Sequence, residues 1–246
     1  MIDFWITKIL MVSKYKNNDM NIDTINKTSK ELKKLLKLKK SPVAVGLVPN
    51  NHKIPENIDK IDEKMCHCQM VNKVRKEYIQ FYALEDDHQC KNGAAVLGMR
   101  KLKPRFANGT DLFKENHYKD IYSAKKTMEK VPTLEAGTIK SIIYSPLEKV
   151  NFIPDVVLII DTPKKIMQIS QAFLYCFGGH LNTNYTGILS LCADGVVKPY
   201  KNDQISVTLG CEGSRDFADI EENEMIIGIP TKYLDYILEG ADSMFS

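Results

Sequence analysis

Short apolar runs of strand length recur along this chain, and stretches with helical periodicity separate most of them. Their β-branched and aromatic composition is typical of strands. The runs occupy residues 42–48, 79–84, 138–147, 154–161, 205–209 and 225–229. This alternation predicts a single α/β or α+β domain in which helices flank a mixed β-sheet. Because nothing resembling a linker interrupts residues 21–246, we expect them to form one domain.

Periodicity and capping residues predict the helices between these runs. They cover residues 23–40, 61–77, 119–130, 163–177, 187–198 and 233–239. The helix at 163–177 has the clearest boundaries, because Thr162 can cap it, Pro163 suits a first turn, and Gly178 follows its end. By the same reasoning the last helix is predicted to end at Gly240.

Residues 1–20 are predicted to be an N-terminal extension, with Met11 and Met20 as alternative starts to Met1. The segment is apolar, but an acidic residue precedes the apolar run, a lysine interrupts it, and no small-residue cleavage site follows, unlike a signal peptide. No stretch of the chain approaches the ~20 apolar residues of a membrane span. We therefore expect a cytoplasmic protein that does not bind a membrane.

The charged residues argue against a nucleic-acid partner. The net charge is only +3, and nearly all basic residues are lysines; the arginines are Arg75, Arg100, Arg105 and Arg215. Lysine lacks the planar fork with which arginine binds bases and phosphates through two hydrogen bonds. The partners that stay open are a small molecule, a redox protein, and further copies of the chain in a homo-oligomer.

Six cysteines carry the main chemical signal: Cys66, Cys68, Cys90, Cys176, Cys192 and Cys211. In a reducing compartment they favour metal binding or thiol chemistry over a disulfide framework. Thiolates bind zinc and iron–sulfur clusters well, although the paired C-x₂-C spacing of zinc ribbons is missing. Cys66 and Cys68 should point apart on a helix, so one of them is expected to be a bystander. Cys176 is expected in the core.

The stretch FYALEDDHQC (81–90) ends a predicted strand in three acids, His88 and Cys90. Cys90 and Cys211 lie near glycine-containing turns that open helices, and a helix start lowers the pKa of a thiol. Cys90 is therefore expected to ionise most easily, with His88 as a base. These residues predict, as one alternative, a thiol-dependent enzyme that uses Cys90 or Cys211. Asp87 or His88 is expected to point toward Cys90.

Arg215 closes the glycine-containing stretch 210–215, directly after a predicted strand. A guanidinium in this place can hold an anion. However, neither the G-x-G-x-x-G nor the G-x-x-x-x-G-K spacing of phosphate-binding loops is present, so no nucleotide site is predicted. Arg215 is instead a candidate for orienting the side chains around Cys211.

Several collinear segments resemble the family called "domain of unknown function 169", which is found largely in methanogens and other anaerobic archaea and bacteria. They are SPVAVGLV, CQMVNKVRKE, FYALEDDHQCKNGAAVLG, KVPTLEAGTIKSIIYSPLEKVNFIPDVVLII, SLCADGVV, VTLGCEGSRDF and MIIGIP. The resemblance spans roughly residues 40–240, within the predicted domain 21–246. The cysteines that match the family pattern are Cys68, Cys90, Cys192 and Cys211. The resemblance implies that Cys66 and Cys176 are additions in this chain.

The resemblance brings no assigned activity, so the sequence does not decide whether the protein is an enzyme. The first hypothesis is an iron–sulfur cluster or zinc ion bound by four thiolates, with neighbouring polar side chains that orient the ligands. The ligands would be Cys68, Cys90, Cys192 and Cys211, and the neighbours Asp87, His88 and Arg215. A thiol-dependent enzyme, or a small-molecule-binding module with structural cysteines, is the alternative.

Overall fold

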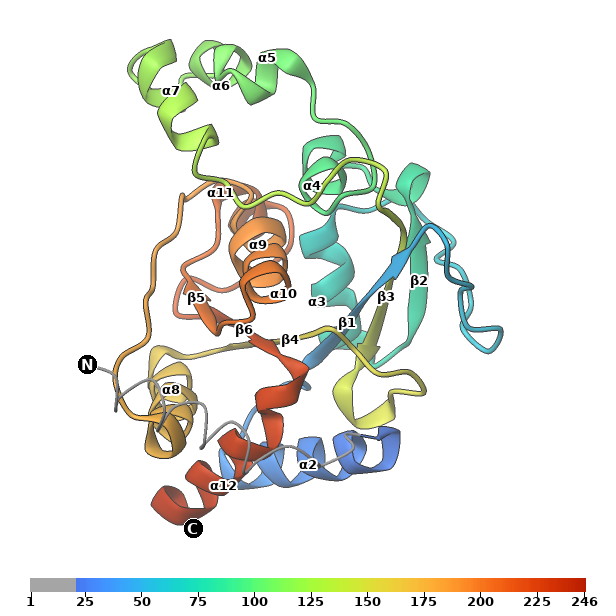
Figure 1. The fold of residues 1–246 in the computed structure, drawn as a ribbon, viewed down its shortest axis with the longest axis vertical. Coiled ribbons are helices and arrows are strands. Elements are labelled where there is room, and N and C mark those ends of the chain that lie inside the picture. The colour runs from blue at the N-terminus through green and yellow to red at the C-terminus, as the bar shows by residue number, and fades with distance from the viewer. Residues whose placement is uncertain (1–20) are drawn as a thin grey trace, which may run out of the picture.

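The computed structural model of the chain describes residues 21–246, and the predicted extension 1–20 lies outside the described residues. At its centre is a six-stranded sheet in the order β2-β3-β1-β4-β6-β5 (Figure 1). The strands are β1 (Val43–Pro49), β2 (Phe81–Leu84), β3 (Ile139–Pro146), β4 (Val156–Asp161), β5 (Ser206–Thr208) and β6 (Met225–Pro230). The sheet and the helices around it confirm the predicted class.

Neighbouring strands of this sheet are antiparallel in each named pair, whereas we expected a mixed sheet. The physical reason is that alternating strands and helices do not determine strand direction. A connection that contains a helix can return the chain on either side of the strand that it leaves, and in either direction. The prediction of a mixed sheet is therefore wrong in this detail.

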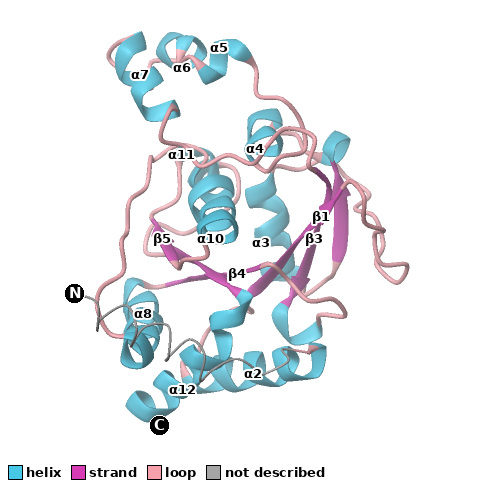
Figure 2. Cartoon of the chain, viewed as in Figure 1, coloured by secondary structure: helices cyan, strands magenta, loops and turns pink. Residues whose placement is uncertain are grey.

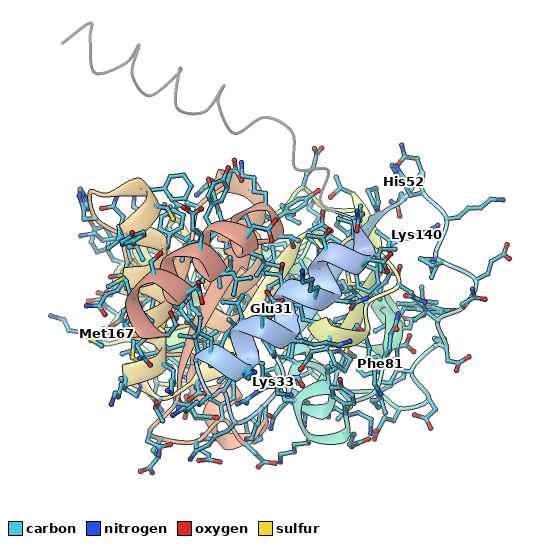
Figure 3. All side chains as sticks on the ribbon, turned by 90° about the horizontal axis from the view of Figure 1, so that it is seen from below. Glu31, Lys33, His52, Phe81, Lys140 and Met167 are labelled. Carbon is cyan, nitrogen blue, oxygen red and sulfur yellow. The ribbon has the colours of Figure 1, made fainter. Side chains whose placement is uncertain are left out.

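Helices cover both faces of the sheet (Figure 2). One face carries α2 (Ile22–Leu35), α8 (Pro163–Phe177) and α12 (Leu234–Phe245). Figure 3 views this layer from below, with Glu31 and Lys33 labelled on α2 and Met167 on α8. The other face carries α3 (His67–Glu77), α4 (Lys91–Val96), α9 (Ser190–Cys192), the π-helix η3 (Ala193–Val197), α10 (Lys198–Asn202) and α11 (Glu212–Asp216).

The remaining helices belong to neither layer. Beyond α4, the chain forms α5 (Pro104–Ala107), α6 (Thr110–Lys114) and α7 (Ile121–Met128), which project from the body of the molecule (Figure 1). Single turns occur at η1 (Glu85–Asp87), η2 (Leu147–Lys149) and η4 (Thr231–Tyr233). Within the described part of the chain, no helix combines the length and the apolar character that crossing a membrane requires.

Side chains of β4 alternate between two cores, one on each face of the sheet. Leu158 and Ile160 pack in the core beneath α3 and α9, together with Cys192. Val157 and Ile159 pack in the other core, beneath α2, α8 and α12. This alternation follows from the period of two in a β-strand. The sheet therefore separates an apolar helical layer from the layer in which the cysteines gather.

The helix at 163–177 has the predicted boundaries, whereas the other predicted helices differ at their ends, and two of these differences bear on the site and the packing. The predicted helix 61–77 begins only at His67. The last helix, α12, continues through Gly240 to Phe245. A Cβ at Gly240 would lie 2.0 Å from the carbonyl oxygen of Ala172 on α8. Gly240 therefore allows two helices to touch, and it does not end one of them.

A second glycine positions the π-helix η3 against the sheet. A Cβ at Gly228 on β6 would lie 2.0 Å from the carbonyl oxygen of Gly195 in η3. Only a residue without a side chain allows the two backbones to approach so closely. Because Cys192 directly precedes η3, this contact also fixes the height of Cys192 above the sheet.

Candidate cysteine site

Three of the cysteines stand immediately before a helix. Cys66 precedes α3, Cys90 precedes α4, and Cys211 precedes α11. At Cys90 the sulfur accepts a hydrogen bond from the backbone N–H of Gly93, with 3.3 Å between the two atoms. The first N–H groups of a helix and the positive end of its dipole lie at this end. The predicted positions of Cys90 and Cys211 at helix starts are confirmed.

A backbone pairing brings Cys66 beside Cys90. The N–H of Met65 donates to the carbonyl of Asp87 at 3.0 Å, and the N–H of Gln89 donates to the carbonyl of Met65 at 2.9 Å. These bonds form an isolated parallel bridge between the two segments. Each segment then turns into its helix at the next cysteine, so the two thiols meet between the starts of α3 and α4.

Contrary to the prediction from the sequence, Cys66 and Cys68 do not both lie on a helix, and whether one of them is a bystander to a metal stays a prediction. Because α3 begins at His67, only Cys68 lies on the helix, and Cys66 precedes it with an extended backbone. The thiol of Cys66 lies close enough to the thiols of Cys68 and Cys90 for both to affect its pKa. The thiol of Cys68 also donates to the carbonyl of Gly213 on α11, 3.8 Å away. The pair therefore connects the Cys90 and Cys211 segments.

Cys192 approaches the same place from α9, and it is buried, with 7% of its surface exposed. A Cβ at Gly93 would lie 3.1 Å from the Cys192 sulfur and 3.4 Å from the Cys90 sulfur. Both sulfurs thus lie against the same point of α4, where a larger residue would collide with them. Cys211 lies close enough to Cys192 to affect its ionisation.

The structure therefore gathers five thiols on one face of the sheet: Cys66, Cys68, Cys90, Cys192 and Cys211. The sixth, Cys176, lies on α8 in the opposite layer, and its thiol donates to the carbonyl of Tyr236 at 3.3 Å. Cys176 is half-buried. Its separation from the others was predicted, but its predicted place in the core is wrong, because the thiol lies at the end of α8 and stays partly exposed.

The expectation that Cys90 ionises most easily is wrong. The neighbouring thiol of Cys66 is the largest cause that raises the pKa of Cys90, and burial raises it further. The hydrogen bond from Gly93 acts in the opposite direction but is outweighed. Burial also raises the pKa of Cys192, and the nearby thiols add to this effect. Crowding and desolvation therefore keep these sulfurs protonated, despite the helix starts.

A buried His67–Tyr144 pair, which the sequence did not suggest as part of a site, lies beneath the thiols. Nδ1 of His67 is 2.7 Å from the hydroxyl oxygen of Tyr144 on β3. Burial raises the pKa of Tyr144, and the thiols of Cys192 and Cys68 contribute to the rise. The only signal in the sequence was the position of His67 between two cysteines. Its fixed hydrogen bond places Tyr144 beside the site.

Two buried histidines, His67 and His88, have ring nitrogens without hydrogen-bond partners among the described residues. His88 is completely buried, and neither of its ring nitrogens has a hydrogen-bond partner among the described residues. The same holds for Nε2 of His67. An unpaired buried polar group costs free energy, so these nitrogens are available to a ligand that reaches them.

The acidic turn is not simply solvated, but Asp87 does not serve the thiols. Its carboxylate accepts the N–H of Leu84 at 2.8 Å and forms an ion pair with Lys60 at 2.9 Å. These bonds hold the turn that connects β2 to Cys90. Of the two predicted neighbours of Cys90, Asp87 therefore supports the backbone, while His88 is buried directly before the site.

Arg215 is engaged with backbone carbonyls. Its guanidinium donates to Leu209 and Glu221, and to Glu224 at 2.7 Å. These bonds tie the loop after β5 to the segment that leads into β6. Arg215 therefore fixes the loop that carries Cys211 instead of presenting its charge to an anion.

Arg75 is a second arginine with a structural task, and sequence reasoning missed it. Arg75 is buried on α3, and its guanidinium forms an ion pair with Glu224 at 2.6 Å. The same guanidinium donates to the carbonyl of Ile160 at 2.9 Å and to the side chain of Asn72. This network pins α3 to β4 and to the segment before β6, and so fixes the position of Cys68 on the first turn of α3.

The thiols in this arrangement do not form a ready-made metal site. Among residues 21–246, no group of three or more histidine, cysteine, aspartate or glutamate side chains is placed so that it could hold a metal ion. The contacts that the thiols make are with one another and with backbone groups. A metal centre is therefore a matter for proposal and experiment.

The buried histidines make stability depend on pH. Burial lowers the pKa of His67 to about 3 and that of His88 to about 4, from an ordinary value of 6.5. Between those values the unfolded chain binds protons that the folded chain excludes, so stability falls as the pH falls. From pH 6.5 to pH 5 each histidine is expected to cost about 2 kcal/mol of unfolding free energy.

Urea unfolding of the wild type and of His88→Asn at pH 7 and pH 5 checks this expectation. The stability of the variant should depend less steeply on pH than that of the wild type. His52→Asn, which changes an exposed histidine, is the control and should leave the pH dependence as it is. Equal slopes for the wild type and His88→Asn would show that His88 is not held neutral by the fold.

Most of the chain is similar in sequence to known proteins. The family model of domain of unknown function 169, described as "Uncharacterised ArCR", matches residues 31–240, which confirms the resemblance predicted from the sequence. The chain is also 36% identical over 224 residues to "Uncharacterized protein MJ0308" of Methanocaldococcus jannaschii, covering 91% of this chain and 96% of that protein. No solved structure matches the chain.

Proposed function

We propose that this chain, which belongs to the domain of unknown function 169 family, binds an iron–sulfur cluster through cysteine thiolates. The proposed ligands are Cys68, Cys90, Cys192 and Cys211. The observation that supports this proposal is the convergence of cysteines from separate segments on one face of the sheet, with Cys90 and Cys211 at helix starts. The family and the relative carry no assigned activity, so the proposal rests on the geometry and chemistry of the site.

The ionisation of the thiols favours a cofactor over a free nucleophile. A nucleophilic cysteine requires a lowered pKa, whereas the pKa values of Cys66, Cys90 and Cys192 are all raised. Buried thiols that hinder one another's ionisation are poor thiolates by themselves. Metal ions change this situation, because a coordinated thiol loses its proton outright. The thiol-dependent enzyme, in the form that uses Cys90, loses support on this ground.

A cluster suits the site better than a single zinc ion. In a tetrahedral zinc site all ligands approach one point, with sulfurs about 2.3 Å from the metal. The described residues contain no group placed to hold one ion in this way. A cluster is itself several atoms wide and takes its thiolates from further apart. A thiolate-ligated cluster is also an anion, and the starts of α3, α4 and α11 favour negative charge.

The surrounding residues suit a redox centre. Hydrogen bonds to sulfur, burial and solvent exposure set the potential of an iron–sulfur cluster, which transfers electrons. Tyr144 and His67 lie beneath the thiols, and His88 has unpaired ring nitrogens. Cys192 is buried, whereas the other proposed ligands are half-buried and reach the surface. A redox protein that docks at that surface, or a small molecule that exchanges electrons there, would be the partner.

Anaerobic reconstitution of the full chain with ferrous iron and sulfide tests the proposal. The expected result is a brown protein with a broad absorption near 400 nm that retains iron and acid-labile sulfide after desalting. A variant with all four proposed ligands changed to serine is the comparison, and its folding is checked by far-ultraviolet circular dichroism. If the wild type retains no more iron or zinc than this folded variant, the thiols are structural and the proposal is wrong.

A further inference from the structure

The fifth thiol of the site, Cys66, has no part in the proposed ligand set, yet it lies against one of those ligands. The bridge at Met65 and His88 holds the two backbones side by side, at the spacing of neighbouring strands. Both chains then turn into helices at the next cysteine, one at Cys66 and the other at Cys90. The position of Cys66 is therefore fixed by the fold beside Cys90.

The two thiols are neighbours. Each affects the pKa of the other, and both are free in this structure. Both side chains are also half-buried, so a reagent can reach the pair from solvent. A disulfide requires two cysteines with closely spaced Cα atoms and side chains that face each other. The backbone bridge pairs Met65 with His88, just before the two cysteines, and so brings their Cα atoms close without a rearrangement of the sheet.

We propose that Cys66 and Cys90 form a redox-active dithiol, which a small-molecule or protein disulfide oxidises to a Cys66–Cys90 disulfide. In alkaline solution one cysteine loses its proton, and its sulfur attacks the oxidant disulfide and releases the first half as a thiol. The other cysteine sulfur then attacks the resulting mixed disulfide and releases the second half. Two protons leave the cysteines and end on the two released thiols, so the pair is oxidised by two electrons and the oxidant is reduced by two.

Other cysteine pairs fit this reaction less well. Cys66 and Cys68 are separated by one residue, and closing such a small ring would distort the first turn of α3. Cys192 is buried, so a reagent does not reach it directly. Cys176 lies on α8 behind the sheet and is therefore remote from the pair. Among the half-buried cysteines of the site, Cys66 and Cys90 are the two whose chain segments a backbone bridge pairs.

The disulfide would also control the proposed cofactor. Cys90 is one of the proposed ligands, and a sulfur that is part of a disulfide cannot be a thiolate ligand. Oxidation and cluster loading would therefore exclude each other. This regulatory consequence rests on the proposed function, whereas formation of the disulfide does not.

Peptide mapping of the metal-free protein tests the disulfide. After treatment with oxidised glutathione, blocking of free thiols with iodoacetamide and digestion with trypsin, the disulfide joins the peptides 65–73 and 77–91. This linked species is expected to exceed any other linked pair by about tenfold. It should disappear in Cys66→Ala and persist in Cys68→Ala, which separates the two cysteines of peptide 65–73. Cys176→Ala is the control and should leave the linked species unchanged.

A different dominant pair, a closed Cys66–Cys68 ring, or persistence of the link in Cys66→Ala would overturn the inference. A second measurement separates it from the proposed function. Protein reconstituted with iron should resist formation of the disulfide, and oxidised protein should not take up iron until it is reduced. If the wild type never retains iron but the disulfide forms, the cofactor proposal fails alone. If iron is retained and the disulfide does not form, this inference fails alone.

Discussion

Serine in place of Cys192 is expected to remove most of the iron that the reconstituted protein retains, by about tenfold or more. Cys192 is the most buried of the gathered cysteines. It is held in place by the close backbone contact between Gly195 of η3 and Gly228 of β6. Neither water nor another side chain can therefore easily replace its thiolate. Iron and sulfide analysis after desalting measures the effect.

The same loss is expected for Cys90→Ser and Cys211→Ser, because a closed site needs all of its ligands. Cys176→Ser is the matched control, since this cysteine lies on the other face of the sheet. A nucleophilic cysteine would give a different result. Only one of the substitutions would then have an effect, and alkylation of the wild type would concentrate on that one cysteine. Retention of wild-type iron by all three variants would remove the cysteines from the proposed ligand set.

Arg75→Met is expected to lower the free energy of unfolding by about 3 kcal/mol, because it leaves the buried carboxylate of Glu224 with only the longer ion pair to Lys40, at 3.8 Å. The side chains of Arg75 and Glu224 are 1% and 9% exposed, and their charged atoms are 2.6 Å apart. The loss also removes the hydrogen bond to Ile160, which fixes α3 to the sheet. Urea unfolding of the metal-free protein measures the change.

The neighbouring residue supplies the control for this prediction. Lys76 forms an ion pair with Asp219 at 2.7 Å, but the side chains of the two residues are 46% and 76% exposed. Lys76→Met should therefore cost no more than about 1 kcal/mol. The double variant Arg75→Met, Glu224→Gln should recover part of the loss, because it no longer buries a poorly paired charge. If Arg75→Met costs as little as Lys76→Met, the buried pair does not hold α3 in place.

Local patterns in the sequence predicted the parts of the fold that depend on neighbouring residues. The helix at 163–177 was predicted with its correct ends, because the proline of its first turn and its terminal glycine act within a few residues, although the Thr162 side chain makes no capping hydrogen bond. Gly240 likewise indicates a helix end in the sequence, yet α12 continues through it. Its role is set by the backbone of Ala172, which is distant in the sequence. No local pattern contains that contact.

Some features of the candidate site could also be predicted from nearby residues, and others could not. The helix starts at Cys90 and Cys211 were readable from the glycine-containing turns that follow them. The membership of Cys66 was not, because it depends on a backbone bridge between residues 65 and 88 that moves the start of α3. The raised pKa of Cys90 likewise depends on the thiol that this bridge brings beside it. Distant contacts thus decide which cysteines meet and how they ionise.

The sheet that separates the cysteine layer from the layer of α2, α8 and α12 also divides the sequence into parts that evolve under different demands. Apart from Gly240, where α12 touches α8, substitutions in the second layer need to keep its apolar side chains packed against the sheet. Insertions or deletions are harder to accept near η3, because a shift of one residue would rotate Gly195 away from Gly228. Related chains can therefore diverge widely behind the sheet, while the register of η3 on the sheet has little freedom to drift.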